Sequence, residues 1–529
     1  MVDVATAAQR AGLLENLRTL VPAADLLVDP LALRPYAMDA FWQGAAPLAV
    51  VAPHTQDGVL AVVRACAARG IAVIPRGGGM SYTKGYVSGR DDCVMLDLRR
   101  LDRIVAIDAE NMIVTAEAGC TWQSIYEALR ERGLRTPYFG PMSGMRATVG
   151  GALSQNSMFY GSATYGTVAE SVLSVKVALA DGSTLVTGSR ANRGGIAFHR
   201  HYGPDVTGVF LSDAGAMGIK LEASIRLIEA PASSTFASFA FDDFRSMVEA
   251  QAAIARRRIA AEMFGLDPYL NGSRTLVKDL KSGLRTLASI AASGRTLREG
   301  LASAASVARA GTDFIEGVRY SLHVVCDGEC DAIAQWRIDE VRRLASRTGR
   351  EIEATIPRVC RATPFKHPGE FLVGHAGERW IPIHACLPLS KANEVYEATM
   401  RYFESKRELL ERYRISTSHL TGSAGTELVF EPAFYYPDAM TEFHLQNLEP
   451  RDAERYRTLP AVPGAGDAVR GMLGDLAQLF LAHGAVHQQI GRFYPYLDSL
   501  DPATAQAVRG LKSLFDPRGL MNPGALGLP

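Results

Sequence analysis

The sequence lacks an excess of charge of either sign. Lys plus Arg and Asp plus Glu each number 56 among 529 residues, so the formal net charge is zero. Proteins that bind nucleic acids usually carry a basic excess that neutralises phosphates. We therefore expect no nucleic-acid partner. Hydrophobic residues make up 47% of the chain, which is ordinary for a protein with a sizeable globular core.

Long apolar runs are also missing. No stretch reaches the ~18 apolar residues that a membrane span needs. Residues 1–17 alternate polar and apolar side chains at helical spacing and lack the basic start and unbroken apolar core of a signal peptide. The sequence therefore predicts a soluble, cytoplasmic protein.

Cysteine is scarce and scattered. The seven cysteines are odd in number and show no framework of paired spacings, so we expect reduced thiols rather than disulfides. Cys326 and Cys330 have a CxxxC spacing, but no second pair of cysteines completes a metal site.

The first half of the chain alternates strand-like and helix-like segments. Residues 57–70 carry apolar side chains at helical spacing and stop at Gly70, which is a C-terminal cap signal. Asp181-Gly182 is typical of a hairpin turn. The expected strands are 48–53, 71–75, 94–98, 102–108, 112–119 and 218–230, with a further helix at 121–133.

Pro231 marks a change of pattern. From about 235 to 465 long helices alternate with strand-like segments, which is typical of an α+β domain. Residues 280–309 place leucines on one helical face and five basic side chains against one acid on the other. This segment is either a solvated cover helix or a weak contact for an acidic membrane surface or a redox partner.

The sharpest local signal is the glycine loop of residues 75–81, PRGGGMS. Consecutive glycines let several backbone N–H groups converge on one anion, because no Cβ blocks the approach. Two more loops of small residues follow at 141–152 and 161–166. Three such loops after successive strand–helix segments predict one extended ligand held mainly by backbone.

The order of these and later motifs carries a family resemblance. PRGGGMS, VMLDLRRLDRI, VTAEAG, TVGGALSQN, GVFLSDAGAMGIKLEASIRL and DPRGLMNPG follow one another along the chain. This set resembles the vanillyl-alcohol oxidase / p-cresol methylhydroxylase superfamily of flavoproteins. The resemblance implies an α+β fold, in which a two-lobed FAD-binding domain is covered by an α+β cap domain that shapes the substrate pocket.

The resemblance also implies domain limits and FAD contacts. The limits are an N-terminal helical segment (1–44), the FAD-binding domain (45–232), the cap (233–467) and a C-terminal segment that returns to the FAD-binding domain (468–529). The expected FAD contacts are Arg76, Gly77, Gly78, Gly79, Met80, Ser81, Pro141, Met142, Ser143, Thr148, Gly150, Gly151, Gly161, Thr164, Tyr165, Gly218, Ile219 and Asn522. Gly161, Thr164 and Tyr165 are expected beside the flavin ring.

The chain departs from the family in three places. Met80 stands where many relatives have a histidine that tethers FAD, so we expect non-covalent FAD; Tyr435, Tyr436 and His419 are the alternative tethers. Val486 and His487 stand where the phenol-oxidising branch has a Tyr-Arg pair. His419 begins a partial copy of the hydroxy-acid branch's metal signature, but a second histidine does not follow, so we expect no metal.

The tail motif HQQIGRFYPY at 487–496 concentrates the candidate catalytic groups. His487 could act as a base or as a cationic partner for reduced flavin. Arg492 could hold a substrate carboxylate through two hydrogen bonds, and Tyr494 could donate or accept one. His375 and His384 are expected to be structural. The segments Glu431-Pro432 and Tyr435-Tyr436-Pro437-Asp438 are weaker candidates for the pocket wall.

These features predict an FAD-dependent oxidase or dehydrogenase that oxidises a small alcohol, 2-hydroxy acid or aromatic alcohol. The alternatives are a flavin transferase similar to the alkyl-glycerone-phosphate synthases and a non-catalytic FAD electron-transfer subunit. The expected partners are a small-molecule substrate and either oxygen or a redox acceptor protein. We also expect a homodimer.

Overall fold

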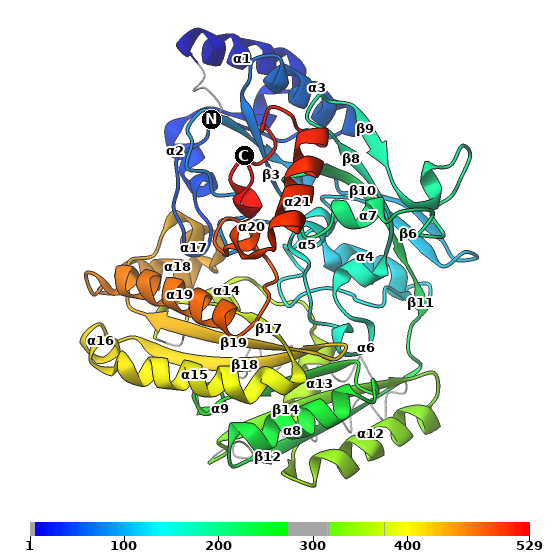
Figure 1. The fold of residues 1–529 in the computed structure, drawn as a ribbon, viewed down its shortest axis with the longest axis vertical. Helices are drawn as coiled ribbons and strands as arrows, with labels where there is room; N and C mark the ends of the chain where they lie inside the picture. The colour runs from blue at the N-terminus through cyan, green and yellow to red at the C-terminus, as the bar shows by residue number, and fades with distance from the viewer. Residues whose placement is uncertain (1–5, 273–314, 316, 375) are drawn as a thin grey trace.

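The computed structural model describes residues 6–272, 315, 317–374 and 376–529. His375 and the segment 280–309 lie outside these described residues. Helices and β-sheets alternate along the described chain, so the predicted α+β class is confirmed. In Figure 1 the small sheets of the first half occupy the upper part of the molecule, and one large sheet occupies the lower part.

Two small sheets form the two lobes of the first half. Three neighbouring strands of the first sheet are parallel, whereas every pair of strands in the second sheet is antiparallel. The first sheet has the order β1 (Leu26–Leu27), β2 (Ala49–Val51), β4 (Cys93–Asp97) and β3 (Ala72–Arg76). The second has the order β5 (Ile104–Asp108), β6 (Ile113–Glu117), β10 (Ile219–Arg226), β8 (Val172–Ala178) and β9 (Thr184–Val186).

Local sequence explains these elements well. Helix α3 (Gln56–Ala67) begins at Thr55, whose hydroxyl accepts a hydrogen bond from the backbone N–H of Gly58. Gly70 follows the helix with φ +68°, a conformation that glycine adopts without a Cβ penalty. All five residues of β4 are buried, as expected for a strand covered on both faces.

The cap region, defined here as residues 233–467, is built on one antiparallel sheet of eight strands. Its order is β15 (Arg350–Ile352), β12 (Ser233–Phe241), β14 (Tyr320–Gly328), β13 (Glu262–Leu266), β18 (Ser416–Ala424), β19 (Glu427–Tyr436) and β16 (Arg379–Pro382), and β17 (Ala385–Pro388) also pairs with β19. These strands are contacted by four helices, α8 (Phe244–Ala255), α12 (Asp331–Ala345), α15 (Ala392–Ser405) and α19 (Ala465–Ala482). The short β7 (Leu134–Arg135) and β11 (Ile228–Glu229) pair beside the region's start, and we propose its boundary at residue 232.

The helices range from single turns to five turns. The longer ones are α1 (Ala7–Leu20), α4 (Trp122–Arg130), α8 (Phe244–Ala255), α12 (Asp331–Ala345), α13 (Thr355–Ala362), α15 (Ala392–Ser405), α18 (Pro450–Arg457), α19 (Ala465–Ala482) and α21 (Pro502–Phe515). The shorter ones are α2 (Pro30–Leu33), α5 (Val149–Gln155), α6 (Ser162–Tyr165), α7 (Val206–Val209), α9 (Pro268–Gly272), α14 (Gly369–Leu372), α16 (Arg407–Arg412), α17 (Glu442–Asn447) and α20 (Tyr496–Ser499).

The residues after α21 return to the first sheet. The backbone N–H of Val73 donates to Leu520, and the N–H of Asn522 donates to Val73, so Met521 pairs beside β3 as an extra parallel partner. The Asn522 amide also donates to the carbonyls of Gly85 and Ala214. The tail therefore supports the strand that leads into the glycine loop.

Buried charges join the cap region to the first half. Arg361 of α13 contacts both Glu262 of β13 and Asp327 of β14, with 2.9 Å between its Nη1 and the Asp327 Oδ1. Arg135 of β7 reaches the other oxygen of Asp327 at 3.0 Å. The backbone N–H of Gly161 donates to Glu262 at 3.1 Å. Two arginines and two carboxylates thus neutralise one another where the cap region contacts the first half of the chain.

Arg361→Met is expected to destabilise the protein by about 3–5 kcal/mol, because it leaves the Glu262 carboxylate buried without its cation. Urea unfolding followed by circular dichroism measures the change. Arg343→Met is the matched control, since Arg343 pairs with Glu340 at the surface and its loss should leave the midpoint unchanged. Equal midpoints for both variants would show that the buried cluster contributes nothing to stability.

Candidate functional site

A cavity of about 460 Å³ lies between the glycine loops of the first half and the cap sheet. One wall comes from the loop after β3, the loop at 141–143, helix α5 and residues 214–220. The opposite wall comes from β13, β18, β19 and β16. The loop at 488–489 also reaches this wall. The cavity is therefore a shared product of segments that lie far apart in the sequence.

The glycine loop packs directly against the second loop. A Cβ on Gly78 would lie 1.7 Å from the carbonyl oxygen of Arg146, and one on Gly77 would lie 2.2 Å from the Thr148 hydroxyl. Gly79 has φ +72°. The glycines are thus needed for contact between two backbone segments, in addition to the ligand approach that the sequence predicts.

Arg76 brings an incompletely partnered positive charge to the cavity wall. Its guanidinium lies over the rings of Tyr36 and Tyr86, at 4.8 and 5.2 Å from their centroids. Its Nε is buried and has no hydrogen-bond partner among the described residues. Burial, followed by the nearby charges of Arg99 and Arg76, lowers the pKa of Arg146 behind the loop. This excess of positive charge suits a bound anion such as a diphosphate.

Helix α5 closes the same wall. Its N-cap Thr148 accepts a hydrogen bond from the backbone N–H of Gly151 at 3.3 Å, and its C-cap Asn156 has φ +50°. Residues of the predicted set that line the cavity are Arg76, Gly77, Gly78, Gly79, Met80, Ser81, Pro141, Met142, Ser143, Thr148, Gly150, Gly151 and Gly218.

Five predicted contact residues lie outside the cavity lining. Gly161 donates to Glu262 and the Thr164 hydroxyl donates to the carbonyl of Ala260 at 2.6 Å, so this segment contacts the cap region instead of the cavity. Tyr165 is partly exposed beside them, Ile219 packs in the core under β3, and Asn522 supports two backbone carbonyls.

Three cap strands present one apolar face to the cavity. Their pairing aligns Phe264 with Gly422 and Val429, and aligns Leu266 with Leu420 and Glu431. Because side chains alternate along a strand, the neighbouring residues Phe430 and Phe434 point into the helix-covered core. Trp380 and Tyr435 extend the cavity face onto β16.

Glu431 is a half-buried carboxyl on this apolar face. Burial raises its pKa to about 7, although a hydrogen bond with Tyr82 opposes part of that rise. The amide of Gln489 donates to the Tyr82 hydroxyl at 3.1 Å. The shared register of β16 and β17 against β19 brings His384 opposite Glu431. A carboxyl with a pKa near neutrality can serve as a general base.

The tail motif lies mostly behind the cavity. His487 is absent from the lining; its ring stacks on Tyr494 at 3.9 Å, and its Nδ1 lies 2.8 Å from the His384 carbonyl. Burial lowers the pKa of His487 to about 4, which disfavours the predicted cationic role at neutral pH. His384 lines the cavity instead, and burial lowers its pKa to about 3.

Arg492 and Tyr494 have protein partners. The Arg492 guanidinium donates to the carbonyls of Lys84, Gly85 and Pro523 and to Asn522, so it offers no free pair of N–H groups to a carboxylate. The Tyr494 hydroxyl accepts from the His384 backbone N–H at 3.0 Å. Both residues hold the tail in place. Their predicted contact with substrate is not supported by these positions.

Sequence reasoning underrated the cap face. Glu431 stands in the strand ELVFEPAFYY, where a charged side chain on an apolar strand could have marked a functional position. Tyr82, His384 and Gln489 have no local pattern that distinguishes them. His384 reaches Glu431 through the register of β16 and β17 against β19, whereas Tyr82 and Gln489 come from loops that are distant in sequence.

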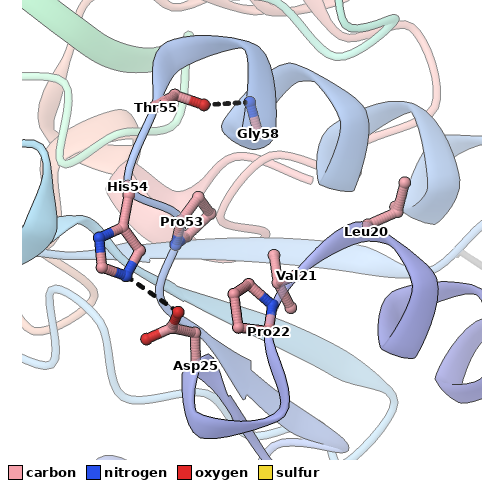
Figure 2. Close-up of a pocket in the computed structure, with 8 residues that line it drawn as sticks. All are labelled: Leu20, Val21, Pro22, Asp25, Pro53, His54, Thr55 and Gly58. Carbon is pink, nitrogen blue, oxygen red and sulfur yellow. Dashed lines mark hydrogen bonds and ion pairs between the residues drawn. The ribbon is translucent and has the colours of Figure 1, made fainter.

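A second, separate pocket of about 320 Å³ lies near the start of α3. Figure 2 shows His54 directed at Asp25, with 2.9 Å between Nε2 and Oδ2, beside Leu20, Val21 and Pro22. Arg100 also contacts Asp25. The pocket shares no lining residue with the large cavity, and the internal ion pairs satisfy its charged groups.

Within the described ranges, no cluster of three or more His, Cys, Asp or Glu side chains has a metal-binding arrangement. No helix in that part of the chain is long and apolar enough to cross a membrane.

Known proteins match this arrangement. A family model described as an FAD binding domain matches residues 47–188, and one described as the C-terminal domain of FAD linked oxidases matches residues 493–526. The solved structure of p-cresol methylhydroxylase with substrate bound aligns with a TM-score of 0.72 at 17% identity, covering 99% of this chain and 98% of that one. The matched models therefore give this chain an FAD binding domain and part of the C-terminal domain of FAD linked oxidases, and its fold is similar to that of p-cresol methylhydroxylase.

Curated relatives resemble part of this flavoprotein. D-2-hydroxyglutarate dehydrogenase of Xanthomonas citri pv. viticola is 30% identical over 48% of this chain and 53% of its own length. D-lactate dehydrogenase [cytochrome] 1, mitochondrial, of Saccharomyces cerevisiae is 25% identical over 38% of this chain and 33% of its own length. The chain thus spans about a third to a half of these relatives. The cofactor of this flavoprotein is FAD, and the glycine loops lie within the matched FAD binding domain.

Gly78→Ala should weaken FAD binding at least ~10-fold, because the new methyl group would push the glycine loop off the Arg146 carbonyl. Titration of the flavin-free protein with FAD, followed by flavin fluorescence, measures the affinity. Gly89→Ala is the control, since nothing lies within 4 Å of a Cβ at that exposed position. Unchanged affinity in Gly78→Ala would refute the assignment of this loop to the cofactor.

Proposed function

We propose that this protein is an FAD-dependent oxidoreductase that oxidises the carbinol carbon of a small alcohol or hydroxy acid. The observation that carries the proposal is Glu431, a carboxyl with a pKa of about 7 on the wall of the FAD cavity. The names of the relatives, lactate and hydroxyglutarate dehydrogenases, agree with oxidation of a C–OH group in general terms.

The residues of the cavity fit FAD. Glycines bring backbone N–H groups to one end, and Arg76 offers an unpartnered Nε beside them. When bound, FAD supplies the two-electron acceptor that takes a hydride from the substrate carbon. We propose that the predicted lining residues from Arg76 to Gly218 hold it without a covalent bond.

Glu431 would take the proton. The ionised carboxylate would accept the proton of the substrate's hydroxyl group. The carbinol carbon would lose its hydrogen together with two electrons, so that its C–O single bond becomes a carbonyl. The Tyr82 hydroxyl, fixed by Gln489, orients the carboxyl. The apolar neighbours Leu420 and Leu266 keep its surroundings poor in water, which holds its pKa near neutrality.

Two alternatives remain distinguishable by experiment. A flavin transferase would form product without any electron acceptor, and an electron-transfer subunit would not be bleached by any substrate. The transferase alternative has its sequence basis in the glycine loop and TVGG segment that resemble the alkyl-glycerone-phosphate synthases, whose paired-histidine tail motif this sequence lacks. Oxygen or a redox protein as the final acceptor, and a homodimeric assembly, remain part of the proposal.

Glu431→Gln should slow anaerobic flavin reduction by about 10²–10⁴-fold while FAD stays bound, because an amide cannot accept the proton. In the parent enzyme the ionised carboxylate is the active form. The reduction rate should therefore rise with pH to a plateau above a pKa of about 7 and fall as pH drops below it. Stopped-flow measurements from pH 5.5 to 9 would show this limb, and the variant should lack it.

Glu427→Gln provides the matched control for that experiment. Glu427 lies on the same strand but is exposed and does not line the cavity. Its replacement should leave both the rate and the pH limb unchanged. A normal rate in Glu431→Gln would contradict the base role and would redirect attention to Tyr82.

Acid precipitation should release the flavin into the supernatant, because Met80 cannot form the histidyl link of the resembling family. Of the other candidate tethers, Tyr435 lines the cavity, whereas Tyr436 and His419 pack among core aromatic residues. The absorbance at flavin wavelengths in pellet and supernatant decides the outcome. Colour that stays in the pellet of the parent but not of Tyr435→Phe would identify a tyrosyl link.

A further inference from the structure

The substrate end of the cavity has an unusual balance of charge. We define the cap chamber as the part of the cavity lined by the cap strands and by residues 488–489. Phe264, Leu266, Leu420, Val429 and Trp380 give it an apolar surface. Glu431 is the acidic group on that surface, and its polar neighbours are neutral.

The cations of the cavity lining lie on other walls. Arg76 belongs to the glycine loop, and Lys220 is paired with Asp213 in β10 and its preceding loop. Lys366 follows α13; its backbone N–H donates to Met142, and its ammonium donates to the Thr363 hydroxyl at 2.8 Å. None of these three residues belongs to the cap sheet.

Basic side chains near the chamber are also unsuited to bind an anion. His384 faces Glu431, but burial lowers its pKa to about 3, so it is neutral at physiological pH. The guanidinium of Arg492 is taken up by backbone carbonyls and Asn522. A carboxylate in the chamber would therefore meet no charged cation on the cap strands that line it.

This arrangement bears directly on 2-hydroxy acids. Their carboxylate is bonded to the carbon that reacts, so it must lie within a few ångströms of the base that takes the hydroxyl proton. At about 4 Å, two like charges near a protein surface repel strongly enough to weaken binding by ~10²–10³-fold. The apolar walls would also remove water from the carboxylate without replacing its hydrogen bonds.

We propose that the substrate is a neutral, largely apolar primary or secondary alcohol, and that the cap chamber excludes 2-hydroxy acids. This inference rests on the proposed oxidoreductase function. The hydroxy-acid names of the curated relatives do not oppose it, because the family models match residues 47–188 and 493–526 and leave the cap strands unmatched. The chamber, rather than the FAD-binding domain, determines which alcohol reaches Glu431.

The test uses pairs of compounds that differ in one group. The FAD-loaded protein is mixed anaerobically with 1-phenylethanol or mandelate, and with 2-propanol or lactate, using both enantiomers of each chiral compound. We expect 1-phenylethanol to reduce the flavin at least ~100-fold more efficiently than mandelate. Faster reduction by mandelate or lactate would overturn the inference, and loss of that activity in Lys366→Met would identify the overlooked cation.

Equilibrium binding separates this inference from the proposed function. Perturbation of the flavin spectrum gives the affinity of each compound without any turnover. We expect mandelate to bind Glu431→Gln at least ~10-fold more tightly than the parent, while 1-phenylethanol binds both alike. If the neutral alcohols bind but reduce no flavin, the oxidoreductase proposal fails and the specificity inference stands. If no neutral alcohol binds, or if mandelate prefers the parent, the specificity inference is wrong.

Discussion

Four buried charges hold the cap sheet over the cofactor loops. Arg361 bridges Glu262 and Asp327, and Arg135 and the Gly161 backbone extend this cluster into the first half. Phe264 and Leu266 follow Glu262 on the same short strand and line the cavity. The position of the apolar wall therefore depends on charged side chains that do not themselves line the cavity. Removing a buried charge from such a cluster exposes the others to an uncompensated desolvation cost.

The cavity is electrically asymmetric. Its glycine-loop end carries the Arg76 guanidinium, whereas the face made by the cap strands is apolar around Glu431. The same burial that raises the pKa of Glu431 also lowers the pKa of His384. Burial therefore favours the neutral form of both Glu431 and His384. Because the pKa of Glu431 is about 7, its carboxyl is about half ionised at neutral pH. An anionic cofactor would meet positive charge at the glycine-loop end, and an apolar group would meet apolar side chains at the cap strands.

Local sequence predicts much of the fold because its signals are local. Gly70, Gly79 and Gly182 adopt positive φ at the positions where the glycine patterns predict turns. The strands 94–98 and 112–119 match β4 and β6 within two residues at each end. The thirteen cavity-lining members of the predicted FAD set lie in the loops of small residues and in the motifs that carry the family resemblance, and that resemblance implies their role.

The catalytic side could not be predicted in the same way. The tail does pass the cavity, at Gln488 and Gln489, but the ring of His487 turns away and stacks on Tyr494. The direction of a side chain in a loop depends on the residues that pack around it, and the spacing of residues in a sequence motif does not predict this packing. Glu431 lies opposite His384 through the pairing of β16 and β17 with β19, and it meets Tyr82 where the loop after β3 reaches the cap sheet. Both contacts join segments that are distant in sequence, so local patterns do not predict them.

The pairing of Met521 with Val73 has a consequence for the order of assembly. Val73 belongs to the strand that leads into the glycine loop, and Asn522 holds the carbonyls of Gly85 and Ala214 on the same side of the cavity. A nascent chain emerging from the ribosome has the glycine loop early but gains this support only after residue 522 has been synthesised. The strand and loops on this side of the cavity therefore gain their support only once residues 521 and 522 are present, so we expect chains cut before residue 521 to hold flavin less tightly.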